Sequence, residues 1–320
     1  MAQTATVTPS QANAQDVRDF IQPIHTAPYP AVDPSTVKLP KPFTVAILGG
    51  HGAVGTGLAR AYASAGASGM LLCARSVPAL EDVAASVKSI NPSIKTVVVA
   101  CDVSSAENVA GAAAVAKEKF GGVVNAVVVN AGYSTPMEKE IAQGEWSTAP
   151  ELFEKAFGVN TCGTYFAARY FLPLLLEATQ EVEAKDEKIP AASFIAISSI
   201  AAPMVGSWVT PPGYCASKMA QARIVEILYE QYGGKRLFCA SLHPGGVMSE
   251  FAKVTPEDFW KYLVDDPNLA GAFCVWLTKD PDKVWGLNGR FLSCKWDVDG
   301  LLAKMDEIAC KDLLRFRIAL

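Results

Sequence analysis

The chain is poor in histidine and has no closely spaced cysteines. Its 320 residues include only three histidines, His25, His51 and His243, and none of its eight cysteines forms a C-x-x-C pair. Zinc sites draw on His and Cys at short spacings, and dithiol redox sites need two neighbouring cysteines. We therefore expect no metal site, no histidine-based triad, and cysteines that act as small buried apolar side chains.

Long apolar runs and an excess of positive charge are also missing. No run reaches the roughly 18 apolar residues that a membrane-spanning helix needs. The first fifteen residues are polar, unlike a secretory signal. The formal net charge of -4 gives no overall basic field for nucleic acid or an anionic membrane. These features favour a cytoplasmic protein with neither a nucleic-acid nor a membrane partner.

The chain divides by composition into an arm and one domain. Residues 1–40 are polar and then proline-rich, which predicts an N-terminal arm. Residues 41–320 form the predicted domain, with a helical tail near residues 299–310. A Ser104-to-Glu107 capping box predicts the start of a helix after the third strand.

Within the domain, short β-branched runs alternate with helical stretches. The predicted strands cover residues 43–48, 70–74, 96–101, 126–130, 193–198, 236–242 and 290–294. Most are apolar throughout, as in strands that are covered on both faces. This alternation predicts an α/β fold, a single-domain doubly wound parallel sheet with helices on both faces.

A glycine-rich loop follows the first predicted strand. Gly50, Gly52 and Gly55 match G-x-G-x-x-G between a strand and a helix, which is the context of a dinucleotide-binding loop. Glycine lets the backbone approach a pyrophosphate, and the helix N-terminus offers N–H groups to it. The alternative is a tight turn with no ligand. The predicted binding residues of this loop are Gly49, Gly50, His51, Gly52, Ala53, Val54 and Gly55.

The end of the second predicted strand has an arginine where NAD-binding proteins place an acidic residue. Cys73-Ala74 is followed by Arg75 and Ser76. A guanidinium can bind a ribose 2′-phosphate, which a carboxylate would repel. The sequence therefore predicts NADP(H) as cofactor, with Arg75 and Ser76 at the phosphate. The alternative is a solvated surface arginine.

Tyr214 and Lys218 form the only Y-x-x-x-K pattern in the chain. Residues four apart share one face of a helix. An ammonium beside a phenol stabilises the phenolate, which makes tyrosine a usable acid or base. A surface Tyr–Lys pair is the ordinary alternative, but this one follows a predicted strand that ends in Ser198-Ser199.

Together, these motifs resemble the short-chain dehydrogenase/reductase family over about residues 43–295. Their order and spacing match: the glycine loop, Asp102-Val103, Asn130-Ala131-Gly132, Asn160, Ser199, Tyr214 with Lys218, and His243-Pro244-Gly245-Gly246-Val247. The C-terminal stretch resembles fungal members. The resemblance implies a Rossmann-type fold and NADP(H)-dependent interconversion of a carbonyl and an alcohol.

The resemblance also implies roles for individual residues. Tyr214 would be the general acid or base, Lys218 would hold the nicotinamide ribose and tune Tyr214, Ser199 would bind the substrate oxygen, and Asn160 would hold a water for proton supply. Further cofactor contacts would come from Asp102, Val103, Asn130, Ala131, Gly132, Pro244, Gly245, Val247 and Ser249.

The chain departs from the family pattern at a few positions. Leu48 replaces a Thr, so a hydrogen bond to the Asn130 turn is expected to be missing, and Val129 replaces an Asn. Ser199 lies about two residues farther from Tyr214 than usual, so Ser198 remains an alternative for the catalytic serine.

The loops expected to form the substrate site are apolar and aromatic. Tyr133, Trp208 and Met248 are the predicted contacts, and they favour a hydrophobic or aromatic carbonyl compound over an acidic one. Two alternatives stay open: a cofactor-binding protein of this fold without turnover, and an epimerase or dehydratase that recycles its cofactor. The resemblance further implies a homodimer or homotetramer.

Overall fold

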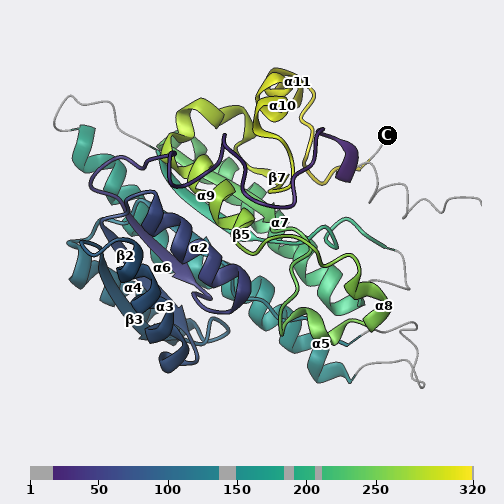
Figure 1. Cartoon of the computed structure of the whole chain (residues 1–320), viewed down its shortest axis with the longest axis horizontal. Helices are drawn as coiled ribbons and strands as arrows, with labels where there is room; N and C mark the ends of the chain where they lie inside the picture. Colours follow the sequence, from purple (N-terminus) through teal and green to yellow (C-terminus); the bar gives the residue numbers. More distant parts are fainter. Residues whose placement is uncertain (1–16, 137–148, 184–190, 206–210, 319–320) are drawn as a thin grey trace, which may run out of the picture.

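A single parallel sheet forms the centre of the computed structural model, which describes residues 17–136, 149–183, 191–205 and 211–318 (Figure 1). Its seven strands lie in the order β3-β2-β1-β4-β5-β6-β7. Their bounds are β1 Thr44–Leu48, β2 Gly69–Ala74, β3 Lys95–Ala100, β4 Ala126–Val129, β5 Ala192–Ile197, β6 Leu237–His243 and β7 Arg290–Ser293. All seven predicted strands are confirmed, each within two residues at either end, and all adjacent pairs are parallel.

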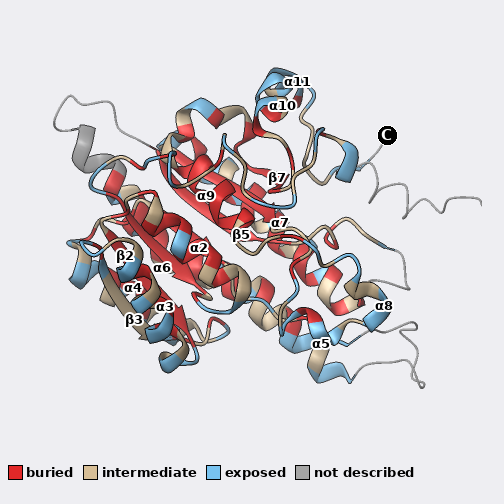
Figure 2. Ribbon diagram, in the orientation of Figure 1, coloured by how far each residue is buried: buried red, intermediate tan, exposed pale blue. Residues whose placement is uncertain are grey.

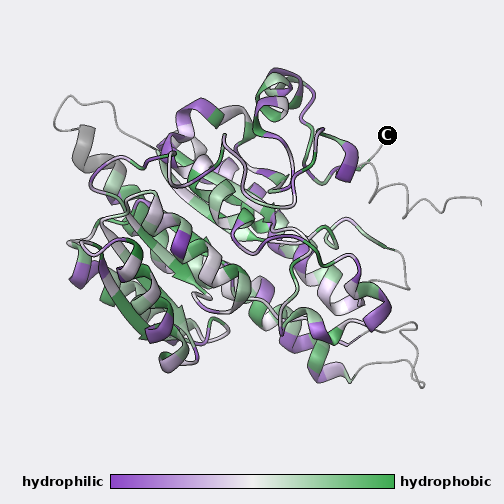
Figure 3. Ribbon diagram, in the orientation of Figure 1, coloured by the Kyte–Doolittle hydropathy of each residue, from purple (hydrophilic) through white to green (hydrophobic). Residues whose placement is uncertain are grey.

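Helices cover both faces of the sheet, which confirms the doubly wound α/β prediction. On one face, α2 (Gly52–Ser64), α3 (Val77–Ile90) and α9 (Leu269–Lys279) pack on alternate strand residues such as Val45 and Ile47. On the other face, α4 (Ala106–Phe120), α6 (Gly163–Glu183) and α7 (Pro212–Tyr232) pack on Ala46 and Leu48. Six of the seven strands are buried and largely apolar because helices cover both faces of the sheet, whereas the edge strand β3 is partly exposed (Figures 2 and 3).

The order of the strands fixes the place for a ligand. After β3 the chain returns to the other side of β1 and forms β4, so the direction of winding reverses between β1 and β4. In such sheets a crevice opens beyond the carboxyl ends of the two strands at the reversal. The glycine loop follows β1, and Asn130-Ala131-Gly132 follows β4.

One helix start differs from the sequence-based prediction. The N-cap of α4 is Ser105, whose Oγ accepts a hydrogen bond from the Asn108 N–H at 3.2 Å. Ser104, the predicted cap, instead donates its hydroxyl and its backbone N–H to Asp102 Oδ1, at 2.7 and 2.9 Å. The capping-box prediction was wrong by one residue, because the nearby carboxylate occupies the Ser104 hydroxyl.

The shorter helical elements lie near the crevice and toward the C-terminus. They are α5 Pro150–Ala156, the π-helical η1 Phe157–Cys162, the 3₁₀ segments η2 Gly233–Lys235, η3 Ala252–Val254 and η4 Pro281–Leu287, and the helices α8 Glu257–Trp260, α10 Val298–Ala303 and α11 Met305–Cys310. The predicted tail helix is thus two short helices, α10 and α11. No helix within the described residues combines the length and apolarity needed to span a membrane.

Residues 17–40 pack against the sheet domain. Ile21, Val32, Val37 and Leu39 are buried in the same apolar core as α2 and α9. Trp296, which follows β7, is fully buried and forms an antiparallel bridge with Ile24. The described part of the N-terminal segment therefore contributes to the core of the domain.

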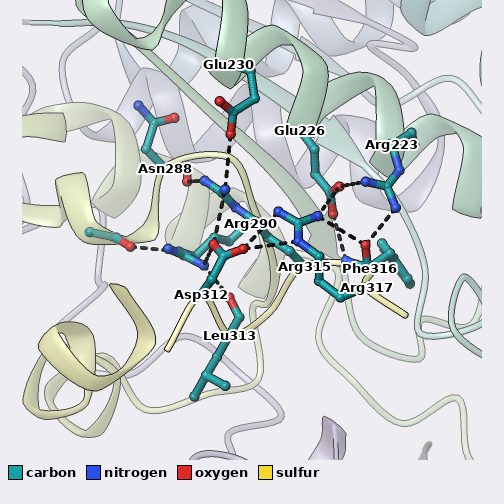
Figure 4. Close-up of polar contacts among 11 residues, drawn as sticks. Arg223, Glu226, Glu230, Asn288, Arg290, Asp312, Leu313, Arg315, Phe316 and Arg317 are labelled. Atoms are coloured by element: carbon teal, nitrogen blue, oxygen red, sulfur yellow. Dashed lines mark hydrogen bonds and ion pairs between the residues drawn. The ribbon is translucent and has the colours of Figure 1, made fainter. Parts of the chain in front are cut away.

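The C-terminal segment docks on α7 through a cluster of charged residues (Figure 4). The Glu226 carboxylate accepts hydrogen bonds from Arg223, Arg317 and the Phe316 N–H, at 2.5, 3.3 and 2.8 Å. Arg315 places its guanidinium carbon 4.4 Å from the centre of the Tyr229 ring. These contacts attach residues 315–317 to the second half of α7, the helix that also contains Tyr214 and Lys218.

Candidate active site

A cavity of about 570 Å³ opens at the carboxyl ends of β1 and β4. Its walls combine most of the predicted site residues. Lining it are Gly49, His51, Gly52, Ala53, Val54, Gly55, Arg75, Asp102, Val103, Asn130, Ala131, Gly132, Tyr133, Tyr214, Lys218, Pro244 and Ser249. Residues from six separate stretches of sequence therefore meet at the crevice that the strand order creates.

The glycine loop has the close approaches that need glycine. Gly49 has a φ of +93°, and a Cβ there would lie 2.4 Å from the Ala131 nitrogen. A Cβ on Gly55 would lie 2.3 Å from the Gly49 carbonyl oxygen. Gly50, in contrast, packs against the Leu72 side chain and is not part of the cavity wall. The sequence pattern located the loop; backbone conformation calls for glycine at Gly49 and at Gly52 (φ +77°), and close packing calls for it at Gly49 and Gly55.

The first turn of α2 fits an anionic ligand. Gly52, Ala53 and Val54 line the cavity, and His51 at the N-cap makes no side-chain capping hydrogen bond. The first N–H groups of a helix have no intrahelical partner, so they can bind phosphate oxygens. The residues present thus fit the pyrophosphate of a dinucleotide.

Asn130 connects the two loops that form the floor of this end. Its Nδ2 donates to the Gly49 carbonyl oxygen at 2.7 Å, and the N–H groups of Asn130 and Ala131 both donate to the Leu48 carbonyl. The Asn130 side chain therefore joins the two loops although Leu48 offers no hydroxyl.

Arg75 and Ser76 follow β2 at the exposed end of the cavity. Arg75 lines the cavity. The pKa of Asp102 is lowered mainly by the hydrogen bond from the Ser104 side chain, and the positive charges of Arg75 and Lys155 lower it further. Ser76 is outside the cavity wall, and its Oγ accepts the Ala79 N–H at 3.4 Å as the N-cap of α3. The arginine is thus positioned at the cavity, and the serine already has a structural role.

Tyr214 and Lys218 face the other end of the cavity from successive turns of α7. The Lys218 Nζ lies 5.9 Å from the centre of the Tyr214 ring. Burial raises the pKa of Tyr214 to about 12, and a hydrogen bond with the Ser199 side chain lowers it in part. Burial also lowers the pKa of Lys218 to about 7.

The two serines after β5 face different groups. Ser199 makes the side-chain hydrogen bond with the Tyr214 phenol. Ser198 is buried, and its hydroxyl donates to the Lys218 carbonyl oxygen at 3.4 Å. Ser199 therefore contacts Tyr214 but is not part of the cavity wall, whereas Ser198 lines the cavity and directs its hydroxyl to the backbone of α7.

Asn160 lies in η1 beneath the Gly132 turn and is fully buried. Its Oδ1 accepts the Tyr133 N–H at 2.8 Å, and its Nδ2 donates to the Tyr133 carbonyl and to Ser217 Oγ, at 2.8 and 2.9 Å. In these contacts Asn160 joins the loop after β4 to α7.

The remaining predicted residues lie near the cavity without lining it, or lie outside the residues that the structure describes. Gly245 (φ +86°), Val247 and Met248 are near the cavity but are not part of its wall. Val247 forms an antiparallel bridge with Val264, and Met248 is exposed. Trp208 lies outside the described residues.

Several wall residues were absent from the predicted set. Lys155 and Val159 precede Asn160 by five residues and one residue, and no sequence motif marks them. The Lys155 Nζ lies 4.5 Å from the centre of the Tyr133 ring. Phe251 also lines the cavity, with its ring centre 5.8 Å from that of Tyr214.

Comparisons with known proteins agree with this arrangement. The short chain dehydrogenase family model matches residues 43–259. The chain is 28% identical to the short chain dehydrogenase pgmD of Aspergillus terreus over 97% of both proteins. It is 31% identical to the short chain dehydrogenase mpl6 of Monascus purpureus over 94% of this chain and 97% of the relative.

A solved structure shows the same fold at low sequence identity. The 7α-hydroxysteroid dehydrogenase complexed with NADH and 7-oxo glycochenodeoxycholic acid superimposes with a TM-score of 0.67 at 18% identity, covering 84% of this chain and 97% of that one. The match of the family model over most of the domain, together with relatives along nearly the whole length, shows that this chain belongs to the short-chain dehydrogenase family of oxidoreductases.

Proposed function

We propose that the protein is an NADP(H)-dependent oxidoreductase that interconverts a ketone or aldehyde and an alcohol, with Tyr214 as general acid or base. One observation carries this proposal. Tyr214 and Lys218 line one end of a cavity whose other end is the glycine loop and the first turn of α2, and the Ser199 side chain hydrogen-bonds to Tyr214. A dinucleotide that spans this cavity would bring its reactive ring to the three side chains.

The catalytic roles follow from these positions. In reduction, Tyr214 donates its proton to the carbonyl oxygen, and Ser199 binds the same oxygen. Lys218 stabilises the phenolate that forms, because an adjacent ammonium favours the charged form of a phenol. Asn160 holds the Tyr133 loop against α7 and, as the family resemblance implies, would hold the water that returns a proton. The bound cofactor supplies the hydride in reduction and accepts it in oxidation.

The cofactor preference rests on Arg75. It is the basic residue at the end of β2 that lines the cavity, at the position where an acidic residue would select NAD. Solved structures of the same fold are complexed with NADH in some cases and with NADP in others, so the fold itself does not select between the two cofactors.

The expected substrate is hydrophobic or aromatic. Phe251 and Tyr133 line the cavity near Tyr214, and Met248 is exposed nearby. Apolar and aromatic walls with a few polar groups suit a small apolar ligand.

The chemical step is tested by a panel of aromatic and alicyclic ketones with NADPH. We expect the wild-type protein to oxidise NADPH with at least one ketone. Tyr214→Phe should lower kcat/KM by about 10²–10⁴-fold because general acid catalysis is lost, while NADPH still binds. Tight NADPH binding without turnover of any ketone would favour a non-redox binding protein. With deuterated NADPH, label that returns to the cofactor instead of remaining in the product would indicate an epimerase or dehydratase.

The cofactor preference is tested by titration of tryptophan fluorescence with NADPH and NADH. We expect tighter binding of NADPH, and Arg75→Ala should weaken NADPH binding by about 10–100-fold because a charge-assisted hydrogen bond is lost. NADH binding should be nearly unchanged. Lys88→Ala, an exposed cation in the last turn of α3, is the matched control. Equal binding of both cofactors by the wild type would reject the role of Arg75.

A further inference from the structure

Gln221 is a fully buried amide in the interior between α6 and α7. It follows Lys218 by three residues, so both side chains lie on the same face of the helix. Burying an amide costs free energy unless its donors and acceptor are satisfied. The contacts of Gln221 therefore indicate why an amide is present there.

Hydrogen bonds connect Gln221 to the candidate active site in a fixed direction. The Lys218 Nζ donates to Gln221 Oε1 at 3.1 Å, and Gln221 Nε2 donates to Thr164 Oγ1 at 2.8 Å. The Thr164 hydroxyl donates in turn to the Asn160 carbonyl oxygen at 2.8 Å. An ammonium only donates, and the Thr164 proton is already used, so the amide can have only one orientation.

Gln221 and the end of β5 together engage two of the three Lys218 protons. The second acceptor is the Ile197 carbonyl oxygen, 2.8 Å from Nζ. Lys218 lines the cavity, so its third proton is left for a ligand there. We propose that Gln221 is a positioning residue that keeps Lys218 charged and directs its free N–H into the cavity, and the catalytic consequence of this role rests on the proposed function.

The surroundings of Lys218 make this role measurable. Within the part of the chain that the structure describes, the titratable group that faces it is Tyr214, one turn earlier on α7. The other elements packed against it present neutral groups: Ile197 of β5, Asn160 of η1 and Gly132 after β4. Among the described residues, no charged partner offsets the burial that lowers the Lys218 pKa. The Ile197 carbonyl and the Gln221 amide oxygen are therefore the groups that stabilise the Lys218 ammonium, so a change at Gln221 should shift the pKa of Lys218.

Two substitutions of similar size should shift the Lys218 pKa in opposite directions. Gln221→Glu places a carboxylate beside the ammonium and should raise the pKa by about one to three units. Gln221→Met keeps the length of the side chain but removes the acceptor, so the pKa should fall. Thr164→Val, which removes only the hydroxyl that orients the amide, should lower it by less. Gln231→Glu, on the exposed part of the same helix, is the matched control and should leave it unchanged.

The pKa is read directly by NMR of protein labelled with carbon-13 at the lysine ε carbons. The Lys218 signal is identified by its loss in Lys218→Arg. In parallel, the pH at which kcat/KM for ketone reduction declines on the alkaline side should follow the same order across the variants. A purely structural role of Gln221 would lower activity in Gln221→Glu and Gln221→Met without moving the two pH values in opposite directions.

The two readouts separate this inference from the proposed function. If the Lys218 pKa is the same in the wild type, Gln221→Glu and Gln221→Met, the inference is overturned whether or not the protein turns over ketones. If the pKa values are ordered as expected but the alkaline decline of an active enzyme does not move, the catalytic part of the inference is overturned. If the Lys218 pKa follows the expected order across the variants in a protein that reduces no ketone, the positioning role of Gln221 is supported and the proposed function is rejected.

Discussion

His243 is a buried titratable residue that supports the loop containing Ser199. It is the last residue of β6, and its Nδ1 accepts the Ile200 N–H at 3.3 Å. Ile200 directly follows Ser199, so this hydrogen bond helps hold the loop that presents the serine to Tyr214. Burial lowers the pKa of His243 to about 3. The residue is therefore a neutral acceptor at physiological pH.

This environment predicts an acid-sensitive stability. The unfolded chain binds a proton at His243 below about pH 6.5, whereas the folded protein does so only near pH 3. The stability that neutral His243 provides is thus present above pH 6.5 and is lost as the pH falls toward 3, by up to about 1.4 kcal/mol per pH unit. Denaturant unfolding at a series of pH values should show a flatter acid limb for His243→Asn, which keeps an acceptor but does not titrate. An equally steep limb in this variant would assign the acid sensitivity to other groups.

The burial of Lys218 predicts that the stability of the protein also depends on pH in the alkaline range. Burial lowers the pKa of Lys218 in the folded protein to about 7, from the 10.5 of an unperturbed lysine. Between these values the unfolded chain binds more protons, so the free energy of unfolding should rise with pH. Lys218→Met should flatten this rise, be more stable than the wild type at pH 7, and lose ketone reduction. Parallel alkaline profiles of the two proteins would mean that the Lys218 charge does not limit stability.

At the scale of the element, the two halves of α7 have different roles. Its first half presents Tyr214 and Lys218 to the cavity, and its second half binds the C-terminal segment through Glu226 (Figure 4). The Glu226 side chain is only 8% exposed. A carboxylate buried to this degree is costly unless it is paired, and here three donors satisfy it.

Loss of the Glu226 charge should therefore weaken the attachment of the C-terminal segment. We expect Glu226→Gln to lower the free energy of unfolding by roughly 1–3 kcal/mol, because an amide cannot accept all three hydrogen bonds and leaves Arg223 and Arg317 poorly paired. Glu230→Gln is the control: its side chain is 67% exposed and meets Arg315 at 3.3 Å, so the effect should be below about 1 kcal/mol. Similar losses in both variants, measured by urea unfolding, would contradict a special role for Glu226.

At the scale of the whole molecule, the outer surfaces of α6 and α7 expose large apolar side chains. Tyr165 of α6 and Met219 and Ile227 of α7 are each 44–49% exposed, and the two helices pack against each other. Scattered apolar side chains are normal on a protein surface, but a row on adjacent helices is typical of an interface. These residues support the expected homodimer or homotetramer.

The assembly is tested by light scattering after size-exclusion chromatography. We expect a mass two or four times the 34.0 kDa of the chain, and Met219→Lys with Ile227→Lys should shift it toward the monomer because two charges would be buried without partners. Leu302→Lys, on the exposed side of α10, should keep the wild-type mass. A monomeric wild-type protein would reject the expectation.

Much of the fold and part of the site could be predicted from the sequence because their signals are local. Each strand is a short apolar run, and runs covered on both faces carry their own signature in composition. Local sequence patterns mark the glycine loop, Arg75, and Tyr214 with Lys218. In each pattern a particular residue type stands at a fixed spacing because the backbone conformation or the chemistry requires it. The start of α4 was missed by one residue, since the choice between Ser104 and Ser105 depends on the Asp102 carboxylate.

The tertiary structure alone decided which side chains meet across long sequence separations. It placed the Ser199 side chain at Tyr214 and the Ser198 side chain in the cavity wall, and it brought Lys155 to the cavity. It also linked Gln221 through Thr164 to Asn160, 61 positions earlier in the chain. Such contacts have no local pattern, because the orientation of each side chain depends on the packing of separate strands and helices around the sheet.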